Sequence, residues 1–207
     1  MDNNKVFAFD LGGVLLGFDY NIALSKIKDR MGVSVDKVIE ELYCNNFGLS
    51  FEKGLLSSEQ FYFNFQDSFK SSLTYAEFAD IWCDIFFAQD EIINLAKTLK
   101  SNYPVFLISN INQLHFDYIL KKFPQVFSLF DELILSFEVR AVKPEKEIYE
   151  ALKKKAKTEF KDIIYIDDRP DLIVAAKKLN LQTIQFTSYN QLLKDLKRLN
   201  IPVEQPN

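Results

Sequence analysis

The stretch FAFDLGGVLLGF, residues 7–18, decides the fold of this chain. An apolar run that follows Lys5 ends abruptly at Asp10, and two glycines, Gly12 and Gly13, follow after Leu11. This pattern predicts a buried strand that delivers one carboxylate to a tight turn. Asp10 is then a nucleophile, a metal ligand, or simply a residue that favours turns.

Five short apolar runs read as buried strands bounded by polar or turn residues. They are KVFAF (5–9), PVFLIS (104–109), ELILS (132–136), DIIYID (162–167) and QTIQF (182–186). Continuous apolar runs, as opposed to alternating ones, are typical of a parallel sheet covered on both faces. Helical patterns separate the last four runs: they start near Asn112, at Pro144 and after Pro170. The alternation predicts an α/β fold, a Rossmann-like doubly wound parallel sheet.

Residues 18–88 interrupt this alternation with helix signals only. The segments are NIALSKIKDRMG (21–32), VDKVIEELY (35–43), one stretch from Ser57 and another from Thr74. Ser57 with Gln60, and Thr74 with Glu77, match the capping box. We therefore predict a core domain of residues 1–17 and 89–207 and a helical cap domain of residues 18–88. Because the cap follows the Asp10 turn, it is placed to cover that turn as a lid.

Composition excludes several function classes. The chain has 207 residues, 48% hydrophobic and 26% charged, and a net charge of -4. This balance is that of a globular domain, and it suggests neither nucleic-acid binding nor a polybasic membrane patch. No segment has the apolar length that a bilayer span requires. We expect a cytoplasmic monomer or homodimer whose partner is a small molecule, with no nucleic acid and no membrane.

Polar side chains follow four of the five predicted strands. They are Asp10, then Ser109 with Asn110, then Lys143 in the loop beyond the third strand, then Asp167 with Asp168. Ligands bind at the carboxyl ends of parallel strands, so we expect these groups to meet. Carboxylates suit Mg²⁺, and a lysine with a hydroxyl or an amide suits phosphoryl oxygens. A carboxylate beside the metal can attack phosphorus and form an aspartyl-phosphate.

Four motifs appear in order at these strand ends: FDLGGVL, LISN, Lys143-Pro144 and YIDD. On them the chain resembles the haloacid dehalogenase-like (HAD) superfamily over nearly its whole length, and the helical insertion matches the cap of that superfamily. It is most similar to the branch that includes bacterial α-glucose-1-phosphatase. The stretches FEKGLLSSEQF, SNINQLH and KPEKEIY also look like that branch.

The resemblance implies a role for each matching residue. Asp10 would be the nucleophile, and Lys143 would neutralise both the phosphate and this aspartate. A Mg²⁺ ion would be bound by Asp10, by the backbone carbonyl of Gly12 and by Asp168, with Asp167 beside it. Phosphate and substrate would be bound by Ser109, the Asn110 backbone, Lys143 and, on the SNINQLH match, His115. The lone His115 also fits a purely structural role on its helix.

Gly12 departs from the pattern of the superfamily. Many HAD phosphatases carry there a second aspartate that serves as general acid and base. A missing acid matters most for a leaving group that departs poorly as an alkoxide. Three interpretations remain open. The substrate could have a better leaving group, as a sugar 1-phosphate or an acyl phosphate does, or the acid could be replaced by a water or another side chain, with Asp19 and His115 as candidates. Alternatively, the protein is a relative that binds its ligand without turnover.

Two more features bear on function. Haloacid dehalogenases also lack the second aspartate, but the adjacent Asp167 and Asp168 argue against that chemistry. Two carboxylates beside an anionic nucleophile are costly without a cation. Leu172 stands where the branch usually has Asn, and Asp171 is the candidate to hold Lys143 in its place.

These observations predict a Mg²⁺-dependent phosphatase that acts on a small phosphate ester, with a sugar phosphate as the expected substrate. The main alternative is a catalytically impaired HAD-fold binding or regulatory protein. A 2-haloacid dehalogenase is a less favoured alternative.

Overall fold

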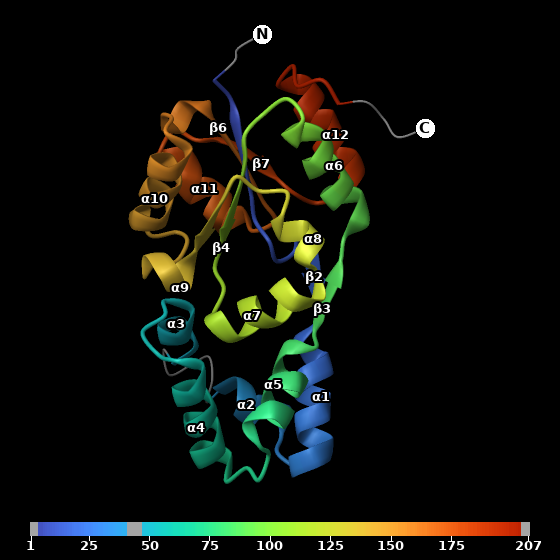
Figure 1. Ribbon diagram of the computed structural model, residues 1–207, viewed down its shortest axis with the longest axis vertical. Coiled ribbons are helices and arrows are strands. Elements are labelled where there is room, and N and C mark those ends of the chain that lie inside the picture. The colour runs from blue at the N-terminus through green and yellow to red at the C-terminus, as the bar shows by residue number, and fades with distance from the viewer. Residues whose placement is uncertain (1–3, 41–46, 204–207) are drawn as a thin grey trace.

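The computed structural model describes residues 4–40 and 47–203, and a five-stranded parallel sheet forms its core (Figure 1). The strand order is β5-β4-β1-β6-β7. Their bounds are β1 (Val6–Phe9), β4 (Val105–Ser109), β5 (Glu132–Leu135), β6 (Ile163–Asp167) and β7 (Gln182–Gln185). Each lies inside a run predicted as a strand, so the predicted α/β fold class is confirmed.

Strand β1 lies at the centre of the sheet, between β4 and β6. Phe9 pairs in register with Leu107 of β4 and with Ile166 of β6. The chain winds outward through β4 and β5, then returns to the other side of β1 as β6 and β7. The carboxyl ends of β1, β4 and β6 therefore meet at the point where the winding direction reverses, which is where such sheets bind ligands.

Helices cover both faces of this sheet. They are α6 (Asp90–Lys100), α7 (Gln113–Lys122), α8 (Pro124–Phe127), α9 (Ser136–Val139), α10 (Lys146–Ala156), α11 (Pro170–Lys178) and α12 (Tyr189–Arg198), with a 3₁₀ turn at Phe160–Asp162. Phe7 and Phe9 of β1 pack with apolar residues of α6 and α12, whereas Val6 and Ala8 pack with those of α10 and α11. Burial on both faces explains why the strands are continuously apolar.

Of the three helices predicted in the core, two begin close to the predicted residue and one does not. Helix α7 follows Asn112, whose side chain caps it, as expected. Helix α11 begins at Pro170, one residue before the predicted start after this proline. The predicted start at Pro144 is wrong, because α10 begins at Lys146. Residues 142–145 form a turn instead, in which the Glu145 backbone N–H donates to the Val142 carbonyl at 2.7 Å.

The described residues of the cap form five helices between two short strands. The helices are α1 (Tyr20–Met31), α2 (Val35–Ile39), α3 (Phe47–Glu52), α4 (Ser58–Phe69) and α5 (Tyr75–Cys83). The strands β2 (Leu16–Phe18) and β3 (Phe86–Ala88) pair antiparallel and join cap to core (Figure 1). Both predicted capping boxes are present. Helix α3 and both strands were not predicted, and the end of VDKVIEELY (41–43) lies outside the described residues.

The cap has an apolar interior of its own. Phe51, Phe61, Phe65, Phe78 and Trp82 belong to one buried cluster within it. The domain boundaries at residues 17/18 and 88/89 stay a prediction, although the paired strands β2 and β3 lie close to both. In the described part of the chain, no helix has both the length and the apolar character to cross a membrane.

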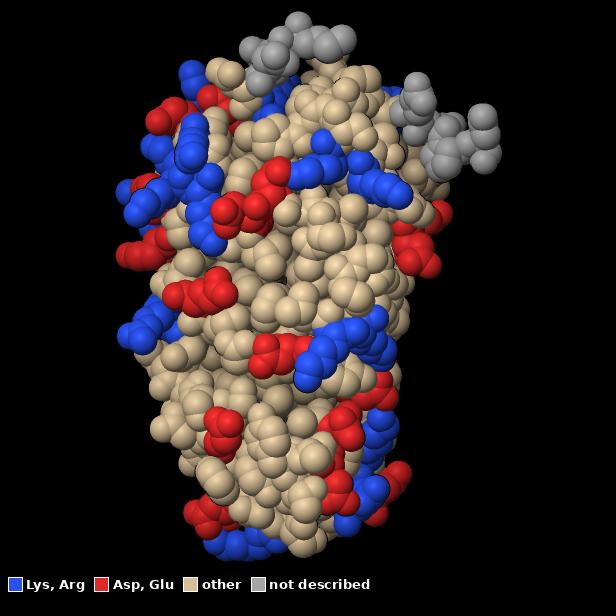
Figure 2. Space-filling model, viewed as in Figure 1, with Lys and Arg blue, Asp and Glu red and all other residues tan. Residues whose placement is uncertain are grey.

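Charged side chains are mixed over the face seen in Figure 2. Lysines and arginines lie among aspartates and glutamates, without a large region of one sign on that face. The face seen in Figure 2 therefore carries no continuous basic patch.

Candidate active site

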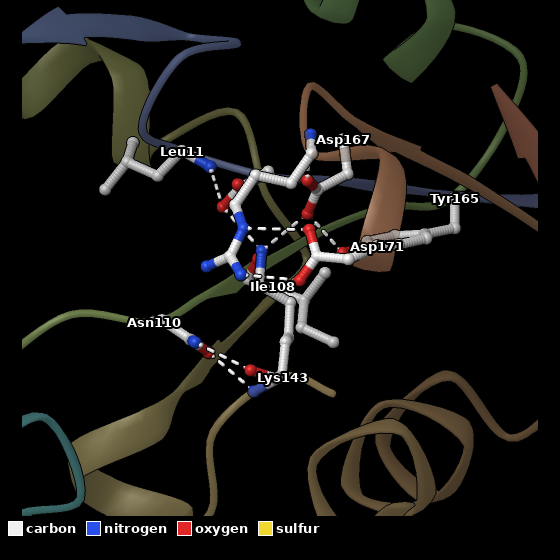
Figure 3. Close-up of polar contacts among 9 residues, drawn as sticks. Leu11, Ile108, Asn110, Lys143, Tyr165, Asp167 and Asp171 are labelled. Atoms are coloured by element: carbon white, nitrogen blue, oxygen red, sulfur yellow. Dashed lines mark hydrogen bonds and ion pairs between the residues drawn. The ribbon is translucent and has the colours of Figure 1, made fainter. Parts of the chain in front are cut away.

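Lys143 lies at the centre of a buried ion cluster where the strands end (Figure 3). Its Nζ is 2.8 Å from Oδ1 of Asp10, after β1, and 2.8 Å from Oδ2 of Asp167, at the end of β6. It also donates to the carbonyl of Ile108 at 3.3 Å. The lysine is 3% exposed and Asp167 is fully buried. A buried ammonium of this kind is tolerated because two carboxylates and a carbonyl surround it.

Asp10 has one oxygen engaged and one available. Its Oδ1 faces Lys143 and accepts the backbone N–H of Leu11 at 2.7 Å, so Oδ2 is left for a ligand or for bond formation. Burial raises the pKa of Asp10 to about 7; Lys143 opposes this shift and Asp167 adds to it. A cation bound at this position would favour the ionised form.

The two adjacent aspartates of the fourth motif differ in their surroundings. Asp167 accepts from Lys143 and from the Tyr165 hydroxyl through Oδ2, and from the Arg169 backbone N–H at 2.9 Å through Oδ1. Lys143 holds the pKa of Asp167 below its usual value although burial opposes this. Asp168 is only partly buried, and burial and Asp167 raise its pKa.

The donor set fits a hard divalent cation. Carboxylate oxygens of Asp10, Asp167 and Asp168 all lie within 4.8 Å of one another. Mg²⁺ prefers a few carboxylate oxygens and keeps several waters. Because both oxygens of Asp167 already accept hydrogen bonds, Asp10 and Asp168 are the aspartates best placed to bind such an ion directly.

The glycines at positions 12 and 13 allow the Asp168 carboxylate to lie close to the turn that follows Asp10. Gly13 has φ +80°, and a Cβ at this residue would lie 2.4 Å from Oδ2 of Asp168. Only glycine satisfies both the backbone and the space. A Cβ at Gly12 would lie 3.0 Å from Cε1 of Phe18, so the position that carries an acid in many relatives is bounded here by an aromatic ring.

A cavity of about 260 Å³ opens over these groups, between core and cap. Its core side is formed mainly by Asp10, Gly12, Ser109, Asn110, Lys143 and Asp168. Its opposite side is formed mainly by Phe18 and Phe86, from β2 and β3, and by Tyr20 and Glu52, from the cap helices α1 and α3. The structure thus brings all the sequence-predicted site residues together, since Asp167 lies directly beneath in the ion cluster and His115 also lines the cavity.

His115 lines the cavity, yet its ring is part of the packed interior. The Asn112 side-chain amide donates to Nδ1 at 3.2 Å, and Nε2–H donates to the Trp82 carbonyl at 3.3 Å. Burial lowers the pKa of His115 to about 4, against a raising effect of the Trp82 carbonyl. The ring is therefore neutral near pH 7 with both nitrogens occupied, which does not suit a general acid.

Two expectations about nearby acids are wrong. Asp171 does not hold Lys143: it binds the Arg169 guanidinium at 2.6 and 3.2 Å and is exposed. Asp19 is exposed too, and its Oδ1 accepts the Asn21 backbone N–H as the cap of α1, so it is no substitute acid. Leu172, which stands where the branch has Asn, lines the cavity as an apolar residue.

Glu52 is the functional candidate that sequence reasoning missed. It comes from the last position of α3 and lines the cavity from the cap side. Burial raises the pKa of Glu52, and Arg169 and Lys143 oppose that shift. The FEKGLLSSEQF stretch was noticed as a resemblance, but nothing in one sequence says that its glutamate faces the strand ends.

A family model of haloacid dehalogenase-like hydrolases matches residues 4–180. The chain belongs to this family. It is 24% identical over 189 residues to a D-ribitol-5-phosphate phosphatase of Bacteroides thetaiotaomicron, covering 87% of this chain and 91% of that protein. A crystal structure of a HAD family enzyme from the same organism, in complex with magnesium and inorganic phosphate, has TM-score 0.80 at 26% identity, covering 87% and 92%.

A second solved structure supports the fold alone. A HAD-like family hydrolase from Porphyromonas gingivalis aligns with TM-score 0.82 at 23% identity, covering 95% of this chain and 98% of that one. The matched length therefore includes most of both the core and the cap of this chain.

Proposed function

We propose that this HAD-like hydrolase is a Mg²⁺-dependent phosphatase that acts on a small phosphate monoester through an aspartyl-phosphate on Asp10. The observation that carries the proposal is the buried Asp10–Lys143 pair, 2.8 Å apart, which lies beside the Asp168 carboxylate at one wall of the cavity. The magnesium and phosphate complex of the similar Bacteroides enzyme supports the same chemistry.

The site residues have different roles in the proposed reaction. Ser109, at the end of β4, and the Asn110 backbone N–H hold phosphoryl oxygens together with Lys143. Asp10 forms a bond from Oδ2 to phosphorus as the ester P–O bond breaks, and a water in the cavity gives its proton to the leaving oxygen. A water then attacks the aspartyl-phosphate and releases inorganic phosphate. Mg²⁺, held by Asp10, Asp168 and the Gly12 carbonyl, supplies charge neutralisation for the phosphoryl oxygens.

The substrate we propose is a phosphorylated sugar or sugar alcohol. The curated relative acts on D-ribitol 5-phosphate, and the cavity has room for a short carbon chain beyond the phosphate. We also expect the enzyme to be cytoplasmic and to act as a monomer or homodimer.

Phosphate release tests the proposal directly. Purified protein is assayed on sugar phosphates, sugar-alcohol phosphates, acyl phosphates and p-nitrophenyl phosphate, with Mg²⁺ or with EDTA. We expect Mg²⁺-dependent turnover and a loss of at least about 10³-fold in Asp10→Asn, because the nucleophile and a metal ligand go together. Asp117→Asn, an exposed aspartate of α7, is the matched control. Turnover that survives both EDTA and Asp10→Asn contradicts the proposal.

The alternative is a HAD-fold binding protein that has lost turnover. It is favoured by Gly12, which lacks the acid of many relatives and where a Cβ would lie 3.0 Å from the Phe18 ring. Background rates on the whole panel, combined with Mg²⁺-dependent binding of inorganic phosphate in calorimetry, would support this alternative.

A further inference from the structure

The hydroxyl of Tyr165 reaches the buried ion cluster from the interior of the fold. Tyr165 lies in β6 two residues before Asp167, so the two side chains leave the strand on the same face of the sheet. The hydroxyl donates to Oδ2 of Asp167, the same oxygen that accepts from Lys143 (Figure 3). Tyr165 is fully buried and does not line the substrate cavity. Its effect on the site is therefore exerted through Asp167 and Lys143.

The ring of Tyr165 is fixed by its neighbours. Tyr149 of α10 packs against it edge to face, with centroids 5.8 Å apart and ring planes at 88°. The Lys143 Nζ lies 5.8 Å from the centroid of the Tyr165 ring, within the range of a cation–π contact. Ala8 of β1, the residue paired with Tyr165 in the sheet, is a fully buried member of the same apolar cluster. The ring thus presents the hydroxyl to Asp167 with little freedom to move.

Both oxygens of Asp167 are held by hydrogen bonds. Oδ1 accepts the Arg169 backbone N–H at 2.9 Å, while Oδ2 is shared by Tyr165 and Lys143. A buried carboxylate is costly without donors, and one that loses a donor attracts the remaining ones more strongly. The phenol therefore reduces the charge that Lys143 alone would have to neutralise. As a result the ammonium lies between two carboxylates, 2.8 Å from Asp167 and 2.8 Å from Asp10.

The described part of the chain offers few side chains that can hold this arrangement. Within it, Tyr165 and Lys143 are the side chains that donate to Asp167. The two positions where the sequence led us to look for another partner of Lys143 do not supply one. Leu172 has no polar side-chain atom, and the carboxylate of Asp171 binds a guanidinium instead. The place of the ammonium thus depends on Asp167, and the orientation of Asp167 depends on Tyr165.

We propose that Tyr165 is a positioning residue of the active site, whose hydroxyl orients Asp167 so that the Lys143 ammonium stays beside Asp10 and the phosphoryl group. The effect on turnover rests on the proposed function, whereas the effect on the ammonium is a property of the protein without substrate. A tyrosine that only filled the core would stabilise the fold and leave the ammonium where it is. The two roles are therefore separable by experiment.

Removal of the hydroxyl alone tests the kinetic part. Tyr165→Phe keeps the ring, its packing on Tyr149 and its contact with Lys143. We expect kcat/KM for p-nitrophenyl phosphate to fall about 10- to 100-fold, as for other groups that orient a site residue. Tyr149→Phe is the matched control, because it removes a buried hydroxyl from the adjacent ring that donates to none of the described site residues. Equal kcat/KM in the two variants overturns the inference.

A variant that retains a donor separates positioning from packing. With p-aminophenylalanine in place of Tyr165, an N–H donor lies where the hydroxyl was, and we expect kcat/KM within about 5-fold of the wild type. A loss as large as that in Tyr165→Phe would assign the effect to packing and overturn the inference. Because it keeps the bond to Asp167, this variant gives a decision even if Tyr165→Phe does not fold.

Crystal structures of the wild type and the two phenylalanine variants test the geometric part without substrate. In Tyr165→Phe we expect the Asp167 carboxylate to turn toward Lys143 and the distance from Nζ to Oδ1 of Asp10 to exceed about 3.5 Å. In Tyr149→Phe we expect the contact of 2.8 Å to be retained. An unchanged ion cluster in Tyr165→Phe overturns the inference. A displaced ammonium in a protein that hydrolyses no phosphate ester keeps the positioning role and removes the proposed function.

Discussion

The side chain of Asn110 holds the backbone of Lys143 from both sides. Its Oδ1 accepts the Lys143 N–H at 2.7 Å, and its Nδ2 donates to the Lys143 carbonyl at 3.0 Å (Figure 3). Asn110 follows β4, so this pair of bonds ties the Lys143 loop to the sheet. Because the ammonium lies at the far end of a flexible chain, its position over Asp10 depends on this anchored backbone.

Removing the Asn110 side chain should lower activity without removing any charge from the site. We expect Asn110→Ala to reduce kcat/KM for a phosphate ester about 10- to 100-fold, the usual cost of losing a group that orients a site residue. Steady-state phosphate release measures this. Asn64→Ala is the control, since Asn64 is exposed on α4 and bonds only locally to the Gln60 carbonyl. Equal rates in the two variants contradict the positioning role.

Gly13 and Gly32 offer a matched pair for testing the metal site. Both have positive φ, +80° and +66°, so alanine is strained by about 1–2 kcal/mol at either residue. A Cβ at Gly32 meets nothing within 4 Å, whereas one at Gly13 meets the Asp168 carboxylate. We expect Gly13→Ala alone to raise the Mg²⁺ concentration for half-maximal activity, about 10-fold or more. A Mg²⁺ titration of both variants tests this, and parallel curves would remove Asp168 from the metal site.

The elements of the fold that could be predicted are those whose conformation is determined by their own stretch of sequence. A run such as IIYID of β6 is apolar throughout because both faces of the sheet are covered, and this pattern is visible in sequence. Strands β2 and β3 have three residues each and exist only because they pair with one another across the whole cap. Pro144 fits a helix start by type, but the Val142–Glu145 turn decided its conformation.

The same division applies to the site. Asp10, Ser109 and Asp167 could be predicted because each follows its own strand, and parallel topology brings the strand ends together. Glu52 could not, since the cap brings it to the cavity by tertiary packing alone. The expected partnership of Asp171 with Lys143 failed because Arg169, two residues away, takes both oxygens of Asp171.

His115 should make the protein less stable in mild acid. Its pKa falls from 6.5 to about 4 on folding because burial disfavours the charged ring, so the unfolded chain binds its proton first as pH drops. Stability from this group is complete above about pH 6.5 and is lost progressively down to about pH 4. At pH 5 the loss should be about 2 kcal/mol relative to pH 7.5.

Urea unfolding of the wild type and of His115→Gln at pH 7.5 and pH 5 measures this loss. Carboxylates titrate alike in both proteins, so the difference between them isolates the histidine. We expect the variant to be the less stable at pH 7.5, because it disturbs the contacts with Asn112 and Trp82, and to lose less stability on acidification. The same loss in both proteins would mean that the ring is charged in the folded state.

Ser136 should control how firmly the Glu52 segment is held. Its hydroxyl accepts the Ile111 N–H at 2.9 Å and has two carbonyl acceptors within reach, Glu52 at 2.7 Å and Ile111 at 2.9 Å. The residue is fully buried. Ser136→Ala leaves those backbone groups without this partner, which should cost about 1–3 kcal/mol of unfolding free energy. We expect KM for a polyol phosphate to rise several-fold, because α3 loses an anchor, while p-nitrophenyl phosphate turnover changes little.

Ser128→Ala is the control for this change, because Ser128 is exposed and bonds only to the nearby Gln125 carbonyl. Both variants are compared by urea unfolding and by steady-state kinetics on the two substrates. A loss of stability in Ser136→Ala with an equal change in both KM values would mean that Ser136 supports the core in general. A change confined to the polyol phosphate ties the cap–core contact at Glu52 to substrate choice.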